Sequence, residues 1–446
     1  MKLWQKNEDV NEAVENFTVG NDRQYDLLLA PFDILGSIAH VKMLGTVGIV
    51  NSSESKTLVA ALQDIYDEVL LPGFKINDSF EDIHSQVEFM LTEKLGDSGK
   101  KIHAARSRND QVLVDVKLYI RSSIEKLIKD IEILFSLLQQ KSEQHKEDLL
   151  PGYTHLQLAM PSSFGLWFGA YAESLVDDVI TLRAAYEVVN KNPLGSAAGY
   201  GSSFPINRKL TTQLLGFADL NYNVVYAQMG RGKAERITAQ ALSNVADTLA
   251  RMSVDVCLYV NQHFNFISLP PAFTTGSSIM PHKKNPDVFE LIRSYCNRIK
   301  ALPNEIMMMT TNLPSGYHRD LQLLKEHLFP AFDTLQNCIK ITILMLNKME
   351  VHKDILKDEK YKYLFSVEVV NKLVSAGMPF REAYKKVGAD IENGIFEFSG
   401  EINHVHEGSI GNLQNKEIKM LMEQELTAFN FPLTQDAIVK LLQREA

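Results

Sequence analysis

The residues at positions 274–286 are the best suited to chemistry, because they combine small side chains, two lysines and an amide. The segment reads Thr-Thr-Gly-Ser-Ser-Ile-Met-Pro-His-Lys-Lys-Asn-Pro. Gly276 lets the backbone approach a ligand, and the Ser277 and Ser278 hydroxyls add to the backbone N–H donors, which suits a carboxylate or a phosphate. Lys283 or Lys284 can then stabilise negative charge that develops during a reaction. The competing interpretation is a surface turn with solvated lysines.

The sequence on either side of this loop favours the functional interpretation. Asp287 is placed as a helix N-cap and Glu290 follows three residues later, as in a capping box, so the loop is expected to end on a rigid element. Residues 264–273 are largely apolar with a Pro-Pro break, which indicates that the loop leaves buried structure. Charge beside buried structure requires a partner, and an anionic substrate supplies one.

A second candidate site lies at the expected start of the longest helix. Residues 101–111 read Lys-Ile-His-Ala-Ala-Arg-Ser-Arg-Asn-Asp-Gln, and helix N-termini attract anions. Arg108 can grip a carboxylate through two parallel hydrogen bonds, and Asn109 can add a donor. The alternative is a capped helix start with surface arginines.

A third candidate is the turn Pro-Gly-Tyr-Thr-His-Leu-Gln at residues 151–157, between two expected helices. His155 in such a loop can transfer protons at neutral pH, and Thr154 stands beside it. Most single histidines have only a structural role, so this pattern on its own favours the structural interpretation.

Two weaker patterns lie further along the chain. Tyr317, Gln322 and Lys325 place a phenol, an amide and an ammonium where they can converge on a polar ligand, although a structural use fits their spacing equally well. His404 and His406 form a His-x-His pair without an obvious carboxylate partner, so we expect no metal site there.

Composition excludes several classes of function. The chain has 446 residues, 45% hydrophobic and 23% charged, and a net charge of -9, which argues against non-specific nucleic-acid binding. Its three cysteines, Cys257, Cys296 and Cys338, lack CxxC spacing and predict neither a disulfide framework nor a thiolate metal site. The first residues lack the apolar core of a signal peptide and the sequence lacks an obvious membrane span, so we expect a cytoplasmic protein without a membrane partner.

Helical periodicity dominates the chain. Residues 100–150 contain neither proline nor glycine, and apolar residues keep helical spacing from position 109, which predicts one very long helix. Further long helices are expected at residues 164–189, 232–264 and 287–302. Four long helices and sparse β-type alternation predict an all-α protein built on a helical bundle.

Shorter helices are expected on both sides of this bundle. Those before position 105 are predicted to break at Pro31, Gly45, Pro72 and Gly73. The resulting division is an N-terminal helical domain at 1–105, a central long-helix domain at 106–357 and a C-terminal helical domain at 358–446.

Two of the long helices are apolar around much of their circumference, for example at residues 254–260. A single four-helix bundle leaves such surfaces partly bare, so we expect the bundles to associate into a homo-oligomer. The alternative is that the terminal regions cover those surfaces.

These segments together resemble the fumarase/aspartase superfamily, whose signature loop has the form GSSxMPxKxNP, present here at residues 276–286. Within the superfamily, residues 106–111, 152–157 and 283–287 resemble the branch that cleaves argininosuccinate. Further similarity occurs at residues 81–84 and 379–383, so the resemblance extends over nearly the whole chain.

The resemblance implies a fold, a reaction and an assembly. The expected subunit is all-helical with three domains, and the expected assembly is a homotetramer whose active sites each combine loops from three subunits. The expected reaction is the reversible elimination of arginine from argininosuccinate, which yields fumarate through a carbanion intermediate. Neither a metal nor an organic cofactor is expected, and the partner is a small-molecule substrate.

The resemblance also implies roles for individual residues. Ser277 is the expected base and His155, polarised by Glu290, the expected acid, although their roles can be exchanged. Lys283 and Asn285 are expected to stabilise the dianionic carboxylate of the intermediate. The expected substrate-binding residues are Asp22, Asp26, Arg108, Asn109, Thr154, Asn285, Tyr317, Gln322 and Lys325.

The chain departs from the superfamily pattern at four places. Asp22 stands where a serine is usual, Ala104-Ala105 replaces Thr-Gly, His282 replaces glutamine, and Gly-Arg-Gly at 230–232 replaces Asp-Arg-Asp. These changes affect binding details and leave the expected catalytic residues intact. Two other functions stay open: another fumarate-releasing lyase, and a structural protein that keeps the fold without turnover.

Overall fold

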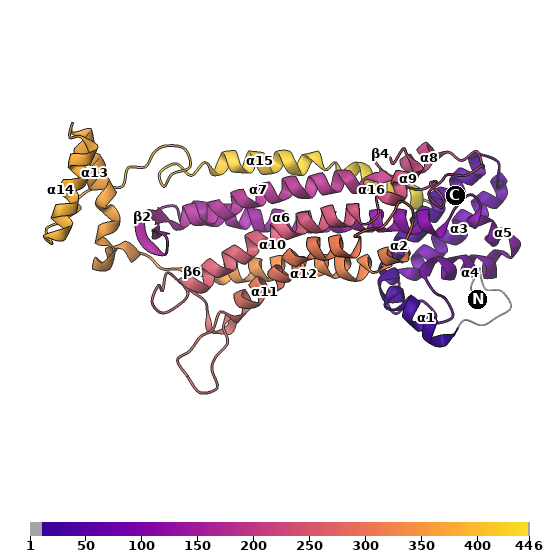
Figure 1. Cartoon of the computed structure of the whole chain (residues 1–446), viewed down its shortest axis with the longest axis horizontal. Helices are drawn as coiled ribbons and strands as arrows, with labels where there is room; N and C mark the ends of the chain where they lie inside the picture. The colour runs from indigo at the N-terminus through magenta and orange to yellow at the C-terminus, as the bar shows by residue number, and fades with distance from the viewer. Residues whose placement is uncertain (1–10, 445–446) are drawn as a thin grey trace.

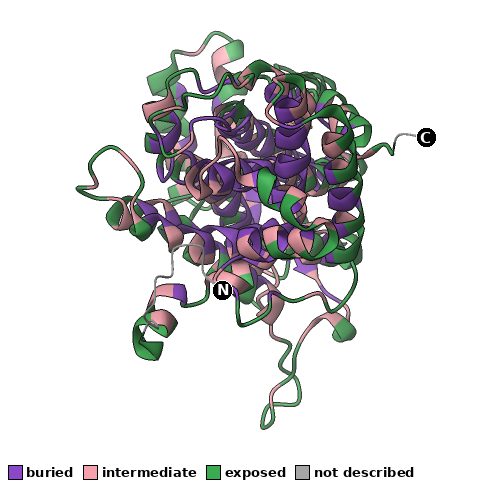
Figure 2. Cartoon of the chain, turned by 90° about the vertical axis from the view of Figure 1, so that its right-hand side faces the viewer, coloured by how far each residue is buried: buried purple, intermediate pink, exposed green. Residues whose placement is uncertain are grey.

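The computed structural model describes residues 11–444, so expectations about the first ten residues lie outside it. Helices dominate the fold, which confirms the all-α prediction. The molecule is elongated, with long helices running along its length and shorter ones at both ends (Figure 1). Buried residues gather in the middle of the bundle when it is viewed along its axis (Figure 2).

The central bundle contains the helices α6 (Arg108–Gln144), α7 (Phe164–Val189), α10 (Lys233–Tyr259), α11 (Asp287–Met309) and α12 (Leu324–Lys348). Each of the four predicted long helices is present. The prediction missed α12, whose 25 residues include Pro330. Fully buried aromatic and branched side chains such as Phe168, Ile124 and Phe332 join these helices in one hydrophobic core.

The helices before the bundle are α1 (Glu12–Val19), α2 (Asp22–Thr46), α3 (Ser52–Val69), α4 (Ile83–Leu95) and α5 (Asp97–Lys100). The predicted breaks at Pro31 and Gly45 are wrong, because α2 continues through both positions. Burial of fourteen of its residues outweighs the hydrogen bond that proline removes. The break at Pro72-Gly73 follows the end of α3, as predicted.

Helix α2 is the one helix among residues 11–444 with the length and hydropathy of a membrane span. However, 72% of the residues in its apolar window are buried inside the protein, as in a core helix. They pack in a second hydrophobic cluster with α3, α4 and the first half of α6. The apolar character of α2 is therefore explained by its place in the fold.

Short strands and helices connect these elements. The antiparallel pair β1 (Leu149–Thr154) and β2 (Gln157–Ser163) forms a hairpin where only a turn was predicted. The remaining strands are pairs of two residues: β3 (Lys191–Asn192) with β4 (Asp219–Leu220), and β5 (Ile267–Ser268) with β6 (Glu350–Val351). The helices between them are α8 (Arg208–Leu214) and α9 (Val224–Met229).

The last part of the chain divides into two regions. Helices α13 (Ser366–Ser375) and α14 (Phe380–Glu392) lie at one end of the molecule with a small core of their own (Figure 1). Helices α15 (Asn415–Ala428) and α16 (Phe431–Leu442) return along the bundle, where α15 packs on α7 and α16 reaches α2 and α8. Helix α16 therefore lies toward the opposite end of the molecule from α13 and α14 (Figure 1).

Candidate active site

A polar pocket of about 250 Å³ lies where the N-terminal helices meet the bundle. It brings together seven of the nine residues that the sequence assigned to substrate binding, and these come from the starts of α2, α6 and α12 and from the segment before α12. The seven are Asp22, Asp26, Arg108, Asn109, Tyr317, Gln322 and Lys325.

Lys325 is the most tightly held residue of this pocket. Its Nζ atom lies 2.5 Å from Asp22 Oδ1 and 2.5 Å from Asp26 Oδ1. Burial alone would lower the pKa of Lys325, but the two carboxylates outweigh burial and raise it. Burial and the neighbouring Asp26 raise the pKa of Asp22 to about 6, against the opposing effect of Lys325. Asp22 therefore belongs to a buried two-acid, one-ammonium cluster.

Arg108 and Asn109 begin α6. Ser107 caps this helix, and Asp110 completes a capping box with it. Both terminal nitrogens of Arg108 are already bonded, to Asp82 Oδ2 at 3.0 Å and to the Ser85 hydroxyl at 2.7 Å. The sequence prediction of a two-pronged grip on a substrate carboxylate therefore requires Arg108 to exchange these partners.

Gln322 and Tyr317 reach the pocket from the segment before α12. The Gln322 amide donates to the backbone carbonyls of Thr18 at 3.0 Å and Val19 at 3.3 Å, so it also fastens the end of α1. Tyr317 is 37% exposed, which leaves its phenol accessible.

Five polar lining residues have no assigned role in the sequence prediction: Glu81, Asp82, His84, Arg231 and Arg319. Arg319 pairs with Glu81 at 2.6 Å, and Arg231 pairs with the buried Glu235 at 2.8 Å. The resemblance to the superfamily at residues 81–84 could have indicated three of them, Glu81, Asp82 and His84. Nothing in the local sequence indicates that Arg319 turns into this pocket.

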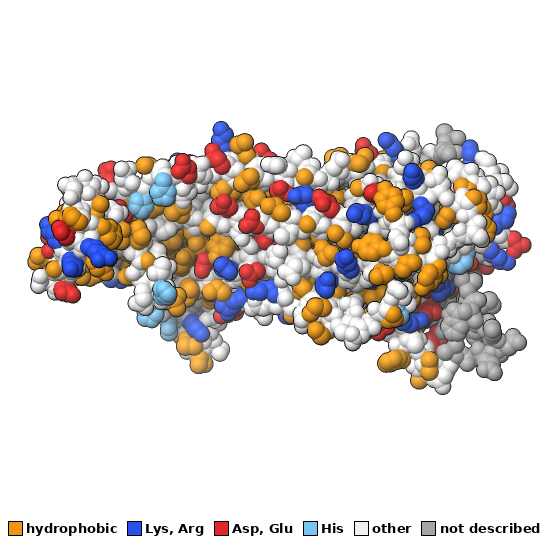
Figure 3. Space-filling model, turned by 45° about the horizontal axis from the view of Figure 1, so that its top comes forward, with side chains coloured by type: hydrophobic (Ala, Val, Ile, Leu, Met, Phe, Trp, Pro, Cys, Tyr) orange, Lys and Arg blue, Asp and Glu red, His pale blue; other side chains and the backbone are white. Residues whose placement is uncertain are grey.

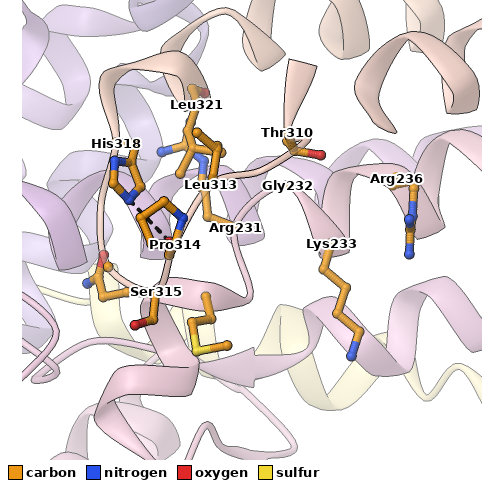
Figure 4. A pocket seen from close by; sticks show the side chains of 13 residues that line it. Arg231, Gly232, Lys233, Arg236, Thr310, Leu313, Pro314, Ser315, His318 and Leu321 are labelled. Carbon is orange, nitrogen blue, oxygen red and sulfur yellow. Dashed lines mark hydrogen bonds between the residues drawn. The ribbon is translucent and has the colours of Figure 1, made fainter. Parts of the chain in front are cut away.

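A second recess of about 240 Å³ adjoins the first, and Arg231 lines both. Figure 4 shows Lys233 and Arg236 on the first turn of α10, on one side of this recess, and the segment that carries Pro314 and His318 on the other. The His318 ring lies 3.1 Å from the Pro314 carbonyl, which holds this segment in a tight turn.

Thr154 and His155 lie at the tip of the β1–β2 hairpin, and both are exposed. His155 and Leu156 adopt positive φ values of 54° and 57°, so the tip is a tight left-handed turn made by two residues with side chains. His155 lines a separate pocket with Asp255 and Tyr259 of α10. The hairpin thus presents His155 away from the pocket that contains Lys325.

The loop at 274–286 projects from the bundle before α11 (Figure 1). Thr275 and Asn285 close its base, because the Asn285 N–H donates to the Thr275 carbonyl at 2.8 Å. The Ser277 hydroxyl accepts backbone N–H groups from Ile279 at 3.3 Å and Met280 at 3.1 Å. Lys283 is exposed.

The predicted cap of α11 is wrong by one position. Pro286 occupies the N-cap, and Asp287 is the first helical residue. The Asp287 carboxylate instead accepts a hydrogen bond from the Thr275 hydroxyl, across the base of the loop. This bond links the loop to the helix that carries Glu290, which is itself exposed.

One chain does not bring the three groups of candidate residues together. The 37 residues of α6 separate Arg108 from the hairpin by about 55 Å at 1.5 Å per residue. The 23 residues of α11 separate the loop from the Tyr317 segment by about 35 Å. Among the described residues, no hydrogen bond joins His155 to Glu290 within the chain.

Two groups of side chains offer atoms of the kind that bind metal ions. His404 has a carboxylate partner, Glu368, at 2.9 Å, whereas the sequence suggested none. Asp33, His84 and Asp115 form a buried group with one potential ligand atom from each residue, all within 4.8 Å of one another.

Comparison with known proteins identifies the family. Residues 5–301 match the model of a lyase family, which covers well over half of the chain. The chain therefore belongs to this lyase family, a part of the fumarase/aspartase superfamily, and it is an enzyme.

Within the superfamily, the chain belongs with the argininosuccinate lyases. It is 57% identical to argininosuccinate lyase of Bacteroides thetaiotaomicron over 443 residues, with 99% of each chain covered. It is 38% identical to that of Thermotoga neapolitana over 387 residues, which covers 86% of this chain and 97% of the relative.

Solved structures share the fold. EDDS lyase in complex with formate superposes with a TM-score of 0.75 at 21% identity, covering 98% of this chain and 95% of that chain. Class II fumarase from Schistosoma mansoni gives a TM-score of 0.71 at 16% identity, covering 95% and 97%. The prediction of a fumarase/aspartase-like fold is thus confirmed.

We expect Lys325→Met to lower the free energy of unfolding by about 3–5 kcal/mol, because it leaves Asp22 and Asp26 as uncompensated buried carboxylates. Lys340→Met on the exposed side of the same helix is the matched control and should cost less than about 1 kcal/mol. Urea unfolding followed by circular dichroism measures both.

The same experiment has a pH dependence of known sign. In Lys325→Met the ammonium that lowers the pKa of Asp22 is gone, so this pKa rises further and the folded variant takes up a proton more readily than the unfolded chain. The difference in free energy of unfolding between Lys325→Met and Lys340→Met should therefore decrease as the pH falls from 7 toward 5. A stability difference that does not change with pH, or two equally stable variants, would contradict a stabilising role for the charge cluster.

Proposed function

We propose that this enzyme catalyses the reversible elimination of arginine from argininosuccinate to give fumarate. The observation that carries the proposal is full-length similarity, at 56–57% identity, to argininosuccinate lyases. The pocket supports it, because a substrate with three carboxylates, an amino group and a guanidinium needs both cationic and anionic partners. Arg108, Arg319, Asp22 and Asp26 supply both kinds.

The chemical obstacle is the weak acidity of the proton that must leave the carbon beside a succinyl carboxylate. Its removal gives a carbanion delocalised into that carboxylate as a dianion, so positive potential must be concentrated there. Ser277 is the proposed base, with Lys283 and backbone donors favouring its alkoxide. Ser277 already accepts two backbone N–H groups, and Asn285 closes the same loop.

The second half of the reaction breaks the carbon–nitrogen bond. His155 is proposed to protonate the departing guanidinium nitrogen, directly or through water, while Glu290 polarises the imidazole. The exchanged assignment, with His155 on the base side and Ser277 on the acid side, uses the same groups. Both assignments require Glu290 to contact His155, and no hydrogen bond joins these two described residues within one chain.

The remaining residues are proposed to hold the substrate. Arg108, Asn109 and Thr154 bind carboxylates, while Tyr317, Gln322 and Lys325 position the arginine half. Asp22 and Asp26 neutralise Lys325 and leave carboxylate oxygens for a cationic group of the substrate. No step in this scheme requires a metal or an organic cofactor.

The active site is proposed to be shared between subunits of a homotetramer. The separations of about 55 and 35 Å along α6 and α11 support this, because three groups with complementary roles cannot meet within one chain. Exposed hydrophobic side chains on α10 and α11 provide a surface for association, including Val254, Leu291, Tyr295 and Met308. Hydrophobic side chains also lie exposed between charged ones on the face in Figure 3.

We also propose the three-domain division at residues 105 and 357, and a cytoplasmic location. Three hydrophobic clusters support the division: one built mainly on α2–α4, one on the long helices and one on α13–α14, although the first also takes in Val114 and Leu118 of α6. Return of α15 and α16 to the bundle makes the third domain discontinuous in space.

The direct test is an assay of purified protein with argininosuccinate, adenylosuccinate, aspartate and malate, following fumarate absorbance. We expect fumarate from argininosuccinate alone. Release from another of these substrates instead would make the protein a different fumarate-releasing lyase. Absence of turnover on all four by a folded oligomer would favour a structural protein.

Ser277→Ala and His155→Asn should each reduce kcat by about two to four orders of magnitude, as expected when a proton-transfer group is removed. Ser278→Ala and His282→Asn in the exposed loop are the matched controls and should have much smaller effects. Thermal unfolding checks that each variant is folded. Full activity of Ser277→Ala would remove this residue from the mechanism.

Mixing the two inactive variants tests the shared site. If Ser277 and His155 of one site come from different subunits, random reassembly creates some sites in which both are native. Unfolding and refolding a mixture of Ser277→Ala and His155→Asn should therefore restore part of the activity, whereas each variant refolded alone stays inactive. Absence of recovery in mixed oligomers verified by mass spectrometry would contradict sharing.

A further inference from the structure

Buried polar atoms without partners are concentrated beside the substrate pocket. Of seven such atoms among the described residues, five belong to Asp33, Asp115, Arg106 and His40. They lie around the start of α6, where the Arg106 guanidinium donates to Ser37 and the His40 ring meets the Ala104 carbonyl. Buried polar groups are normally satisfied, so this concentration needs a functional or structural explanation.

His84 lies at the centre of this region. Its Nδ1 atom is 2.8 Å from Asp33 Oδ1 and 3.6 Å from Asp115 Oδ2, and its side chain is 6% exposed. Three elements contribute: Asp33 from α2, His84 from α4 and Asp115 from α6. The Asp33 carboxylate bonded to Nδ1 favours the doubly protonated ring, and Asp115 lies near the same nitrogen without a hydrogen bond to it.

The charges around the ring support its protonation. Burial alone would lower the pKa of His84, but Asp33, Asp115 and Asp82 outweigh burial and raise it to about 9. Burial and the neighbouring Asp33 raise the pKa of Asp115 well above its usual range, although His84 and Arg106 act to lower it. The pKa of Asp33 is instead lowered, because His84 and Arg106 outweigh its burial, so Asp33 is the main negative charge that faces the ring. Gln111 also donates to Asp33, so that carboxylate is held in place from two sides.

The second ring nitrogen is the one available to the pocket. Because Nδ1 faces the aspartates and His84 lines the pocket, Nε2 is left for a ligand, and no described residue bonds it. The other cations of the pocket are already tied to carboxylates, in the pairs Arg108–Asp82, Arg231–Glu235, Arg319–Glu81 and Lys325–Asp22/Asp26. His84 thus offers a charged donor that need not break an existing ion pair.

We propose that His84 is a protonated carboxylate-binding residue of the substrate pocket, and that Asp33 is the positioning residue that keeps its ring charged and oriented, with Asp115 packed beside the same nitrogen. This inference rests on the proposed function, which supplies a substrate with carboxylates. The ligand is a carboxylate of the succinyl half, because Asp82 and Ser85, which flank His84, hold Arg108 beside it.

The first experiment uses the unmodified protein. Solid-state ¹⁵N spectra of histidine-labelled enzyme should show a residual imidazolium signal at pH 8, where ordinary histidines are neutral. His84→Gln should lose that signal, and His103→Asn, altered at a half-exposed histidine outside the pocket, should retain it. A wild-type spectrum containing only neutral rings at pH 8 would overturn the proposal even if argininosuccinate is cleaved.

The second experiment separates binding from structure. His84→Gln should weaken fumarate binding and raise the KM for argininosuccinate by about 10- to 100-fold, the range for a lost charged hydrogen bond. Asp33→Asn should bind fumarate progressively less well between pH 6 and pH 8, because His84 then loses its proton. In the double variant, Asp33→Asn should add nothing at pH 8 to the effect of His84→Gln.

Additive losses in that double variant would show that Asp33 acts independently of His84 and would overturn its positioning role. Unchanged fumarate binding by folded His84→Gln would overturn the proposed contact. A metal at the same three residues is the other chemistry to test. Loss of activity on dialysis against EDTA, with recovery on adding Zn²⁺ or Co²⁺, would show that these three residues bind a metal ion and would overturn the imidazolium proposal.

Discussion

The rigid length of α6 is the constraint on which the proposed mechanism depends. A helix of 37 residues fixes the Arg108 pocket at one of its ends and the His155 hairpin at the other. Its buried stripe, from Val116 to Leu138, ties it into the bundle, so bending it to close the distance would break the core. We therefore propose that the reacting groups meet through neighbouring copies of this scaffold.

This arrangement divides the work of the site. The pocket beside α2 and α6 carries groups that are buried and already paired, such as Lys325 with Asp22 and Asp26. The hairpin and the loop at 274–286 instead expose His155 and Lys283 to solvent. The proposed binding groups and the proposed catalytic groups are thus kept apart within a chain, and association of subunits would complete the site and exclude water from it.

Much of the fold could be predicted from the sequence because long helices bury regular apolar stripes. The predicted helix at 164–189 has the observed bounds of α7. The errors arose where tertiary burial overrides local preference: Pro31 and Gly45 lie inside α2, and Pro330 lies inside the undetected α12. The hairpin at 149–163 was missed because its two proline residues obscure strand alternation.

The pocket was only partly predictable for a related reason. Motif resemblance indicated Arg108, Gln322 and Lys325, but the Asp33–His84–Asp115 contact joins residues more than 30 positions apart in sequence and has no local signature.

The decisive measurement is a crystal structure of the assembled enzyme with fumarate bound. The account predicts the diacid among Lys283 and Asn285 of one subunit, His155 of a second and Arg108 of a third. Fumarate held entirely by residues of one chain, far from Lys283 and Asn285, would contradict it.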